Sequence, residues 1–210
     1  MKKEGKEILV KVIILSVVFG AIAGAFTTYS ILGIREPTEE DYIKEFYNVE
    51  TSVHVSPHSI RKEMAKDGSN FVLVDLRSQE EYEEEHIATA VSIPAYKDKD
   101  NSDYGAIERI TNSFKELREA NPDKDIIVYC YSIPCMTGRK VGKMLADEGI
   151  YVKHLGIGWN EWRYHWELWN HYHEWETTDM MDYVASGSEP GSVKGVEKKE
   201  VCRIEGGIGC

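Results

Sequence analysis

Two cysteines five positions apart, Cys130 and Cys135, are the residues of this sequence best suited to chemistry. Cys130 ends the apolar run 126–130, and the loop that carries Cys135 leads into a helical pattern at Arg139. A thiol in such a loop lies near converging backbone N–H groups and the positive end of a helix, and both favour its anionic form. Because the thiolate is the nucleophilic form of cysteine, the loop predicts nucleophilic chemistry on a small anion.

The segments around this loop alternate between strand and helix patterns, which predicts one α/β domain with a parallel sheet covered by helices. Strands read as continuous apolar runs, and helices as amphipathic spacing with caps. Active residues of such open sheets lie at the carboxyl ends of strands, where Cys130 stands. The expected strands are 53–55, 71–75, 90–93, 126–130 and 151–155. The expected helices are 57–68, 104–120 and 139–148. A further short helix is expected to begin at the capping box of Ser78 and Glu81.

Five landmarks along residues 53–169 resemble, in order and spacing, a single rhodanese-like domain. They are Ser56-Pro57, Asp75-Leu-Arg77, the segment 81–90 around His86, the strand-end Cys130, and Gly156-Ile-Gly158-Trp159-Asn-Glu-Trp162. The resemblance implies a small α/β sheet and a cysteine loop whose amides hold an anionic sulfur. It also implies a sulfurtransferase that moves sulfane sulfur through a cysteine persulfide, with a small anionic sulfur donor, a thiol acceptor and no cofactor.

The family's cysteine is usually followed by two residues, a glycine, one residue and then an arginine or a similar residue, and it usually follows a strand directly. Cys135 fits the first property and Cys130 the second, so the catalytic residues expected from the resemblance are Cys130, Cys135 and Arg139. We favour Cys130 as nucleophile, because a strand end fixes where the sulfur points, with Cys135 as resolving thiol. The reverse assignment and a static disulfide remain open. The residues expected to bind substrate are Thr137, Gly138, Arg139 and Lys140.

Other uses of the two thiols fit the sequence less well. Related folds that bind phosphate or arsenate place an arginine after five intervening residues, and neither cysteine has one there. Pro134 also removes one loop N–H group that could hold an oxyanion. The cysteine pairs lack the two-residue gap of zinc knuckles, so no metal is expected. A non-catalytic rhodanese-like binding module is the main alternative to an enzyme.

Three polar residues near the strand ends are expected to be structural. The resemblance implies that Asp75 and Arg77 orient the fold through buried hydrogen bonds and ion pairs. His86 stands alone before an apolar position, where a histidine is more often a buried hydrogen-bond donor than a catalytic base.

The N-terminal region predicts a membrane protein. Residues 12–34 form an uncharged apolar stretch long enough to span a bilayer, with lysines before it and acidic residues after it. The positive-inside bias places residues 1–11 in the cytoplasm and the rest of the chain outside. A cleaved signal peptide is the alternative, because small-residue motifs follow the apolar core. The net charge of −11 argues against nucleic acid as a partner, and a protein partner stays unknown.

After the anchor we expect a stalk over 35–52, the rhodanese-like domain over 53–176 and a flexible tail over 177–210. The domain is expected to end in one Trp- and His-rich helix across 159–175, whose tryptophan stripe packs on the sheet or reaches a membrane or a partner. Its histidines fit a metal site poorly. The tail carries the last two cysteines, which could form a small disulfide loop. These histidines and cysteines are His165, His171, His173, Cys202 and Cys210.

Overall fold

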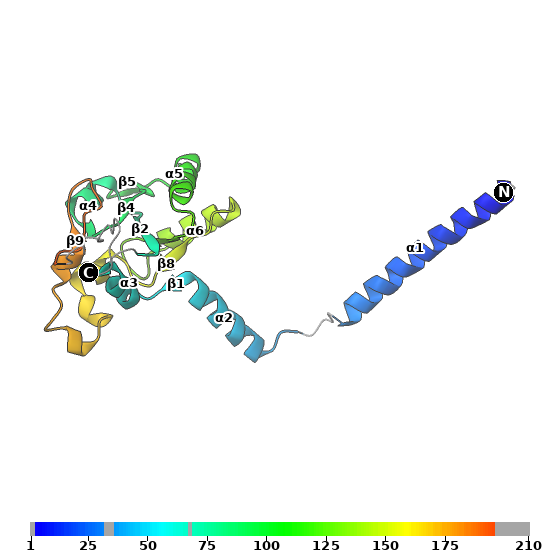
Figure 1. The fold of residues 1–210 in the computed structure, drawn as a ribbon, viewed down its shortest axis with the longest axis horizontal. Helices are drawn as coiled ribbons and strands as arrows, with labels where there is room; N and C mark the ends of the chain where they lie inside the picture. The colour runs from blue at the N-terminus through cyan, green and yellow to red at the C-terminus, as the bar shows by residue number, and fades with distance from the viewer. Residues whose placement is uncertain (1–2, 32–35, 67–68, 196–210) are drawn as a thin grey trace, which may run out of the picture. The chain divides into compact units, whose positions relative to one another are not determined.

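The computed structural model describes residues 3–31, 36–66 and 69–195. The chain divides into two compact units, residues 1–48 and 49–210, which are described separately. Figure 1 shows the order of the elements along the chain. The cysteines of the expected terminal loop, Cys202 and Cys210, lie outside the described residues.

Helix α1 (Lys3–Ile31) dominates the first unit. Its segment Gly5–Ser30 is long and apolar enough to cross a membrane, and its apolar side chains are exposed. The helix therefore begins earlier than the stretch 12–34 that the sequence suggested.

Helix α2 (Glu39–Val53) occupies the expected stalk and crosses the boundary between the units. Thr38 and Asp41 cap its start: the Asp41 carboxylate accepts from the backbone N–H of Thr38 at 2.9 Å, and the Thr38 hydroxyl accepts from the N–H of Asp41 at 3.3 Å. This reciprocal pair satisfies backbone donors that a helix start leaves free.

A five-stranded sheet forms the centre of the second unit, in the order β1-β8-β7-β2-β4, and every pairing in it is parallel. This confirms the predicted fold class. The strands are β1 (His54–Val55), β8 (Lys153–Leu155), β7 (Asp125–Tyr129), β2 (Phe71–Asp75) and β4 (Val91–Ser92). The central pair, β2 and β7, runs in register over five residues, from Phe71 beside Asp125 to Asp75 beside Tyr129.

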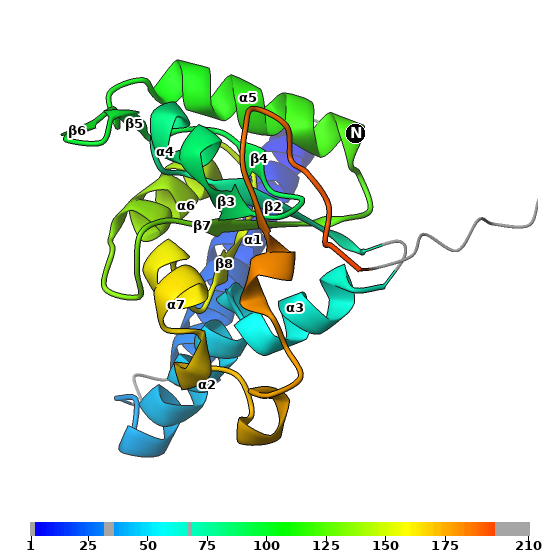
Figure 2. The same cartoon turned by 90° about the vertical axis from the view of Figure 1, so that its left-hand side faces the viewer.

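Helices cover both faces of this sheet, and each face has its own apolar core. Residues of a strand alternate between the cores because successive side chains point to opposite faces: Leu73 belongs to one core and Val74 to the other. One core holds residues of α3 (Pro57–Met64) and α7 (Trp159–Tyr164), the other residues of α5 (Ile107–Ala120) and α6 (Thr137–Asp147). Figure 2 shows α5 and α3 on opposite sides of the sheet.

Helix α4 (Gln79–Glu84) begins at the predicted capping box of Ser78 and Glu81. Helix α3 is shorter than expected: it ends at Met64, and Gly68, its expected stop, lies outside the described residues. Two small sheets complete the domain, β3 (His86–Ile87) with β9 (Val184–Ala185), and β5 (Tyr96–Asp98) with β6 (Asn101–Ser102).

The single helix expected over 159–175 is wrong. Helix α7 ends at Tyr164 and is followed by two short 3-10 turns, η1 (Trp166–Leu168) and η2 (Tyr172–Glu174). The ring of Trp169 folds back onto Trp162, with centroids 4.9 Å apart, and its indole N–H donates to the α7 carbonyl of Glu161 at 3.0 Å. The same carbonyl also accepts the backbone N–H of His165 at 3.2 Å, so the tryptophan stripe packs by reversing the chain at the helix end.

The flexible tail expected from residue 177 is also wrong for residues 177–195. The turn η3 (Met180–Tyr183) leads into β9, which pairs antiparallel with β3. Met180, Val184 and Val193 are buried in the core shared with α3 and α7. The polar composition of this segment concealed these three apolar anchors, which are spaced too irregularly to form a recognisable pattern.

Candidate active site

The two candidate cysteines lie against each other. Cys130 follows the last residue of β7 and is buried, while Cys135 is partly exposed on the loop before α6. Their Sγ atoms are 3.1 Å apart, and both thiols are free. The strand end and the helix start thus bring both candidates to one point at the carboxyl edge of the sheet.

The loop between the cysteines is held on both sides. The hydroxyl of Tyr131 donates to the carboxylate of Glu81, the residue that also caps α4. The backbone N–H of Ile133 donates to Glu161 Oε1 of α7 at 3.2 Å. A Cβ atom on Gly158 would lie 2.2 Å from the backbone nitrogen of Ser132, so only glycine lets the chain before α7 approach the loop so closely.

Backbone hydrogen bonds add to this support. The N–H groups of Trp159 and Asn160, at the start of α7, donate to the carbonyls of Cys130 and Tyr131, both at 2.8 Å. The loop therefore has a fixed shape, with the cysteine sulfurs on a rigid scaffold.

Cys135 lies at the start of α6, whose first residue is Thr137. The Thr137 hydroxyl oxygen is 3.4 Å from Cys135 Sγ, and it also lies 2.9 Å and 2.8 Å from the hydroxyls of Tyr96 and Tyr104. A hydroxyl oxygen has two lone pairs and one proton. When both tyrosines donate to Thr137, its own proton is left to point at the sulfur.

These contacts shift the pKa values of the two thiols in opposite directions. A hydrogen bond from the Cys130 thiol, aided by Thr137, lowers the pKa of Cys135 to about 4 although partial burial opposes the shift. The same contact with Cys135, together with burial, raises the pKa of Cys130. Cys135 is therefore the more acidic thiol of the pair. The nucleophile favoured from the strand end, Cys130, is the buried and less acidic member.

The residues expected to bind substrate have other contacts. Arg139 Nη1 donates to the backbone carbonyls of Ile133 and Cys135 at 3.0 and 3.1 Å, so its guanidinium holds the loop. Lys140 Nζ lies 4.9 Å over the ring centre of Tyr104. Gly138 packs against His154: a Cβ atom there would lie 2.2 Å from His154 Nε2. Of the four, Thr137 makes the direct contact with a cysteine sulfur.

Three positions of the loop offer no free N–H group to an anion. Ile133 donates to Glu161, Cys135 donates to the Ser132 carbonyl at 3.0 Å, and Pro134 has no N–H. An anion at Cys135 is stabilised by the Cys130 thiol, the Thr137 hydroxyl and the backbone N–H groups of Thr137 and Tyr131.

Asp75 and Arg77 form a buried ion pair, with Arg77 Nη2 2.7 Å from Asp75 Oδ2. The Tyr129 hydroxyl donates to the same carboxylate at 2.7 Å, and Arg77 also donates to the Glu85 carbonyl at 2.7 Å. The Tyr129 hydroxyl thus ties β7 to β2 one residue before Cys130. The fully buried His86 belongs to a separate contact: its Nδ1 donates to the Tyr82 carbonyl at 2.7 Å, and its ring stacks on that of Tyr82.

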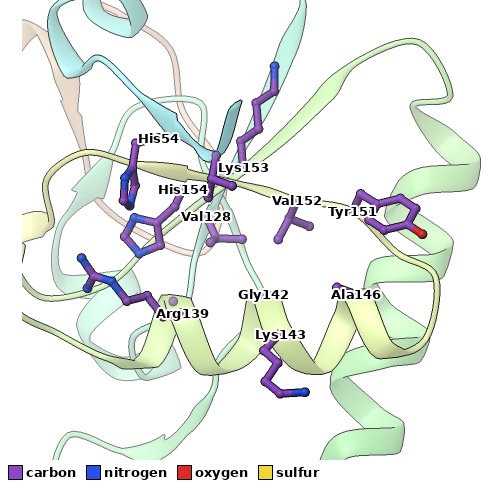
Figure 3. Close-up of a pocket in the computed structure, with 12 residues that line it drawn as sticks. His54, Val128, Arg139, Gly142, Lys143, Ala146, Tyr151, Val152, Lys153 and His154 are labelled. Atoms are coloured by element: carbon purple, nitrogen blue, oxygen red, sulfur yellow. The ribbon is translucent and has the colours of Figure 1, made fainter. Parts of the chain in front are cut away.

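A cavity of about 340 Å³ lies beside the loop, between α6 and β8. Figure 3 shows His54 and His154 at one end of it, next to Arg139. The Nδ1 atom of the buried His154 donates to the Leu155 carbonyl at 2.6 Å, while its Nε2 has no hydrogen-bond partner. Burial lowers the pKa of His154, so the ring is neutral. Sequence reasoning missed this cavity, although Gly138 and Gly142 of α6 line it.

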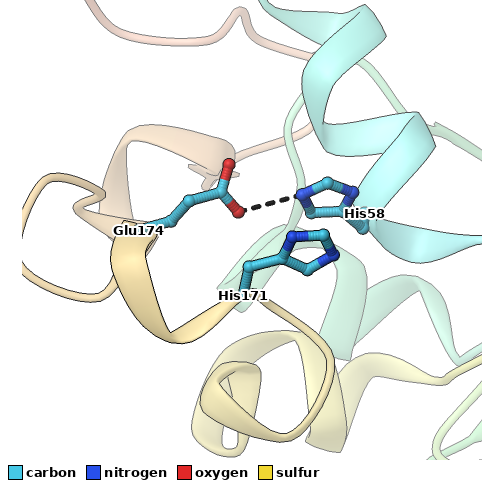
Figure 4. A group of neighbouring side chains, drawn as sticks. All are labelled: His58, His171 and Glu174. Carbon is cyan, nitrogen blue, oxygen red and sulfur yellow. Dashed lines mark hydrogen bonds and ion pairs between the residues drawn. The ribbon is translucent and has the colours of Figure 1, made fainter.

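His171, from the aromatic segment 159–175, belongs to a separate cluster with His58 and Glu174. His171 stacks on His58 of α3, with centroids 4.2 Å apart and planes 8° apart, and His58 Nε2 lies 2.9 Å from Glu174 Oε2 (Figure 4). Imidazole binds a metal at about 2.0–2.1 Å through lone pairs in the ring plane, so two stacked rings cannot both face one ion. Arg61 and Lys62 also contact the Glu174 carboxylate. In this arrangement the cluster is an ion-pair anchor between α3 and η2.

The Rhodanese-like domain profile matches residues 56–165, just over half of the 210-residue chain. The chain belongs to the rhodanese-like domain family, as the fold and the cysteine loop indicate.

Two curated proteins illustrate its relatives. The HTH-type transcriptional regulator Rv0324 of Mycobacterium tuberculosis is 31% identical over 98 residues, which are 47% of this chain and 37% of the regulator. The thiosulfate sulfurtransferase GlpE of Coxiella burnetii is 29% identical over 97 residues, which are 46% of this chain and 75% of that protein. Among solved structures, the BH2092 protein of Bacillus halodurans is 25% identical and covers 60% of this chain and 82% of its own, with a TM-score of 0.45.

Proposed function

We propose that this protein is a membrane-anchored sulfurtransferase that carries sulfane sulfur as a cysteine persulfide, with Cys135 as the nucleophile. The Cys135 thiolate attacks the outer sulfur of a donor such as thiosulfate, the sulfur–sulfur bond of the donor breaks, and sulfite leaves with its electron pair. An acceptor thiolate or cyanide then takes the outer sulfur from the persulfide and restores the Cys135 thiolate.

One observation carries this proposal: the partly exposed Cys135 Sγ lies 3.1 Å from Cys130 Sγ and 3.4 Å from the Thr137 hydroxyl oxygen at the start of α6, and these contacts lower the pKa of Cys135. A thiolate at neutral pH is the reacting form, and its partial exposure gives a donor access to it. The similarity to GlpE, a thiosulfate sulfurtransferase, supports thiosulfate as the first donor to test.

Location is part of the proposal. The apolar segment Gly5–Ser30 would anchor the chain, and the lysines before the apolar stretch would keep the N-terminus in the cytoplasm. The rhodanese-like domain would then lie outside. A membrane-impermeant maleimide should label the reactive Cys135 in intact cells, and label appearing only after lysis would place the domain inside.

A non-catalytic binding module is the second candidate. Its supporting observation is that Arg139 Nη1 and the Cys135 N–H donate to carbonyls within the loop, while the Ile133 N–H donates to Glu161 of α7. These donors are already used, so they do not stabilise a sulfur oxyanion as it forms.

Thiocyanate formation from thiosulfate and cyanide separates the candidates. Thiocyanate formation is measured for three proteins in detergent micelles: the full chain, its Cys130→Ser variant and its Cys135→Ser variant. We expect the Cys130→Ser variant to form thiocyanate repeatedly, because serine still offers a hydroxyl donor to Cys135, and the Cys135→Ser variant to form none. Equal activity of both single variants, or none in either, would contradict the assignment.

A further inference from the structure

The contact between the cysteines has a consequence for the proposed persulfide. When sulfur is loaded on Cys135, its Sγ becomes the inner sulfur of the persulfide and keeps its place next to the Cys130 thiol, 3.1 Å away. A disulfide bond is about 2.05 Å long, so the two sulfurs need to approach by only about 1 Å to bond. Each loaded chain thus carries its own attacking thiol.

We propose that Cys130 reduces the persulfide within the chain and releases hydrosulfide, so that the protein converts sulfane sulfur to sulfide. The Cys130 sulfur attacks Sγ of Cys135, the bond between the inner and outer sulfurs breaks, and the outer sulfur leaves with the electron pair. The Cys130 proton goes to the leaving sulfur. Cys130 and Cys135 are oxidised to a disulfide, and the sulfane sulfur is reduced to HS⁻. This step rests on the proposed function.

The placement of Cys130 favours attack on the inner sulfur. Cys130 is buried, and its side chain contacts Sγ of Cys135 itself. The outer sulfur would extend from Cys135, whose side chain is partly exposed. Attack on the outer sulfur would only move the persulfide onto Cys130, a position that an external acceptor cannot reach.

Loading also changes the acidity of Cys130. The contact with Cys135 is the main cause that raises the Cys130 pKa, and it depends on a negative Sγ that the persulfide no longer has. Because the attacking thiol is held in place by the strand end and the loop, the reaction within the chain has the advantage of proximity over any external thiol.

The product disulfide must be reduced before another turnover. A dithiol reductant can do so by thiol–disulfide exchange at the partly exposed Cys135 sulfur, which leaves Cys130 and Cys135 reduced and the reductant oxidised. The inferred cycle therefore takes in a sulfane-sulfur donor and a dithiol, and it gives out hydrosulfide and the oxidised dithiol.

The test is a single turnover on the full chain in detergent, with Cys202→Ser and Cys210→Ser introduced so that no other thiol takes part. Reduced protein freed of reductant receives thiosulfate, and sulfite, hydrosulfide, free thiols and intact mass are measured. We expect this protein to release sulfite and hydrosulfide in equal amounts, to lose both thiols and to become lighter by two hydrogen atoms. The further variant Cys130→Ser should release sulfite alone and keep one added sulfur.

Two other outcomes separate a failure of this inference from a failure of the proposed function. If the protein with Cys130 intact keeps the added sulfur as the Cys130→Ser variant does, and no hydrosulfide appears, the inference is overturned while the proposed sulfur transfer stands. If the Cys130→Ser variant releases no sulfite and gains no sulfur from thiosulfate, the proposed function fails and this step falls with it.

Discussion

The hydroxyl oxygen of Thr137 lies 3.4 Å from the sulfur of Cys135, and two tyrosine hydroxyls lie close enough to donate to that oxygen. Thr137 thereby links the aromatic residues Tyr96 and Tyr104 to the thiol of Cys135. Under the proposed function, a Thr137 proton turned toward that sulfur favours its anionic form.

Removal of this hydroxyl should weaken the thiolate. A hydrogen bond to a charged group contributes about 1.5–3 kcal/mol, so Thr137→Val should raise the pKa of Cys135 by about one to two pH units. The rate of alkylation by iodoacetamide as a function of pH measures this pKa. Thr137→Ser keeps the hydroxyl and should leave the profile near that of the parent protein; equal profiles for the two variants would contradict the role of Thr137.

Two glycines of α6 should respond in opposite ways to alanine. A Cβ atom at Gly138 would lie 2.2 Å from His154 Nε2, whereas at Gly142 its nearest neighbour is Val152 Cγ2 at 3.8 Å. Gly138→Ala should cost about 1–3 kcal/mol of unfolding free energy through overpacking. Gly142→Ala should add about 0.4–1 kcal/mol by stiffening the unfolded chain. Urea unfolding of both variants checks the contrast, and similar midpoints would refute it.

The buried pair of Asp75 and Arg77 should be far more costly to break than an exposed one. Asp75→Asn leaves the Arg77 charge buried without its partner, for an expected loss of about 3–5 kcal/mol. The exposed pair of Lys143 and Asp147 on α6 gives the control, since Lys143→Gln should cost less than about 1 kcal/mol. Thermal unfolding compares them, and equal losses would show that burial of the ion pair is unimportant.

Glu174 should make stability depend on pH. Burial of its side chain opposes ionisation, but contacts with His58, Lys62 and Arg61 lower its pKa to about 2, from 4.5. A carboxyl with a lowered pKa stabilises the fold fully above its unfolded pKa and loses that contribution as the pH falls toward 2. The stability gap between the parent and Glu174→Gln should therefore be constant above pH 4.5 and shrink below it. A gap that stays constant down to pH 2 would contradict this ion-pair anchor.

Local patterns in the sequence were enough to predict the main strands of the central sheet. The apolar run 71–75 is β2, the run expected to end in Cys130 is β7 with a shift of one residue, and the capping box at Ser78 starts α4. These features depend on neighbours in the chain, so a single sequence contains their cause. Cys130 stands at the carboxyl end of its strand for the same reason.

The site depends on contacts that local patterns do not encode. Tyr96 and Tyr104 lie 41 and 33 positions before Thr137, and no spacing rule connects them. The reversal at Trp169 depends on stacking with Trp162 and on a hydrogen bond to the Glu161 carbonyl, which only the folded chain brings together. The choice of Cys135 as the anion depends on which thiol is buried, and sequence alone could not reveal that.

The central claim is that the Cys135 thiolate takes up sulfane sulfur, and the intact mass of the Cys130→Ser variant after incubation with thiosulfate tests it most directly. The account predicts a gain of one sulfur atom that cyanide removes as thiocyanate, and no gain when Cys135→Ser is the sole change at the loop. An unchanged mass in the Cys130→Ser variant, or added sulfur that persists in Cys135→Ser, would contradict it.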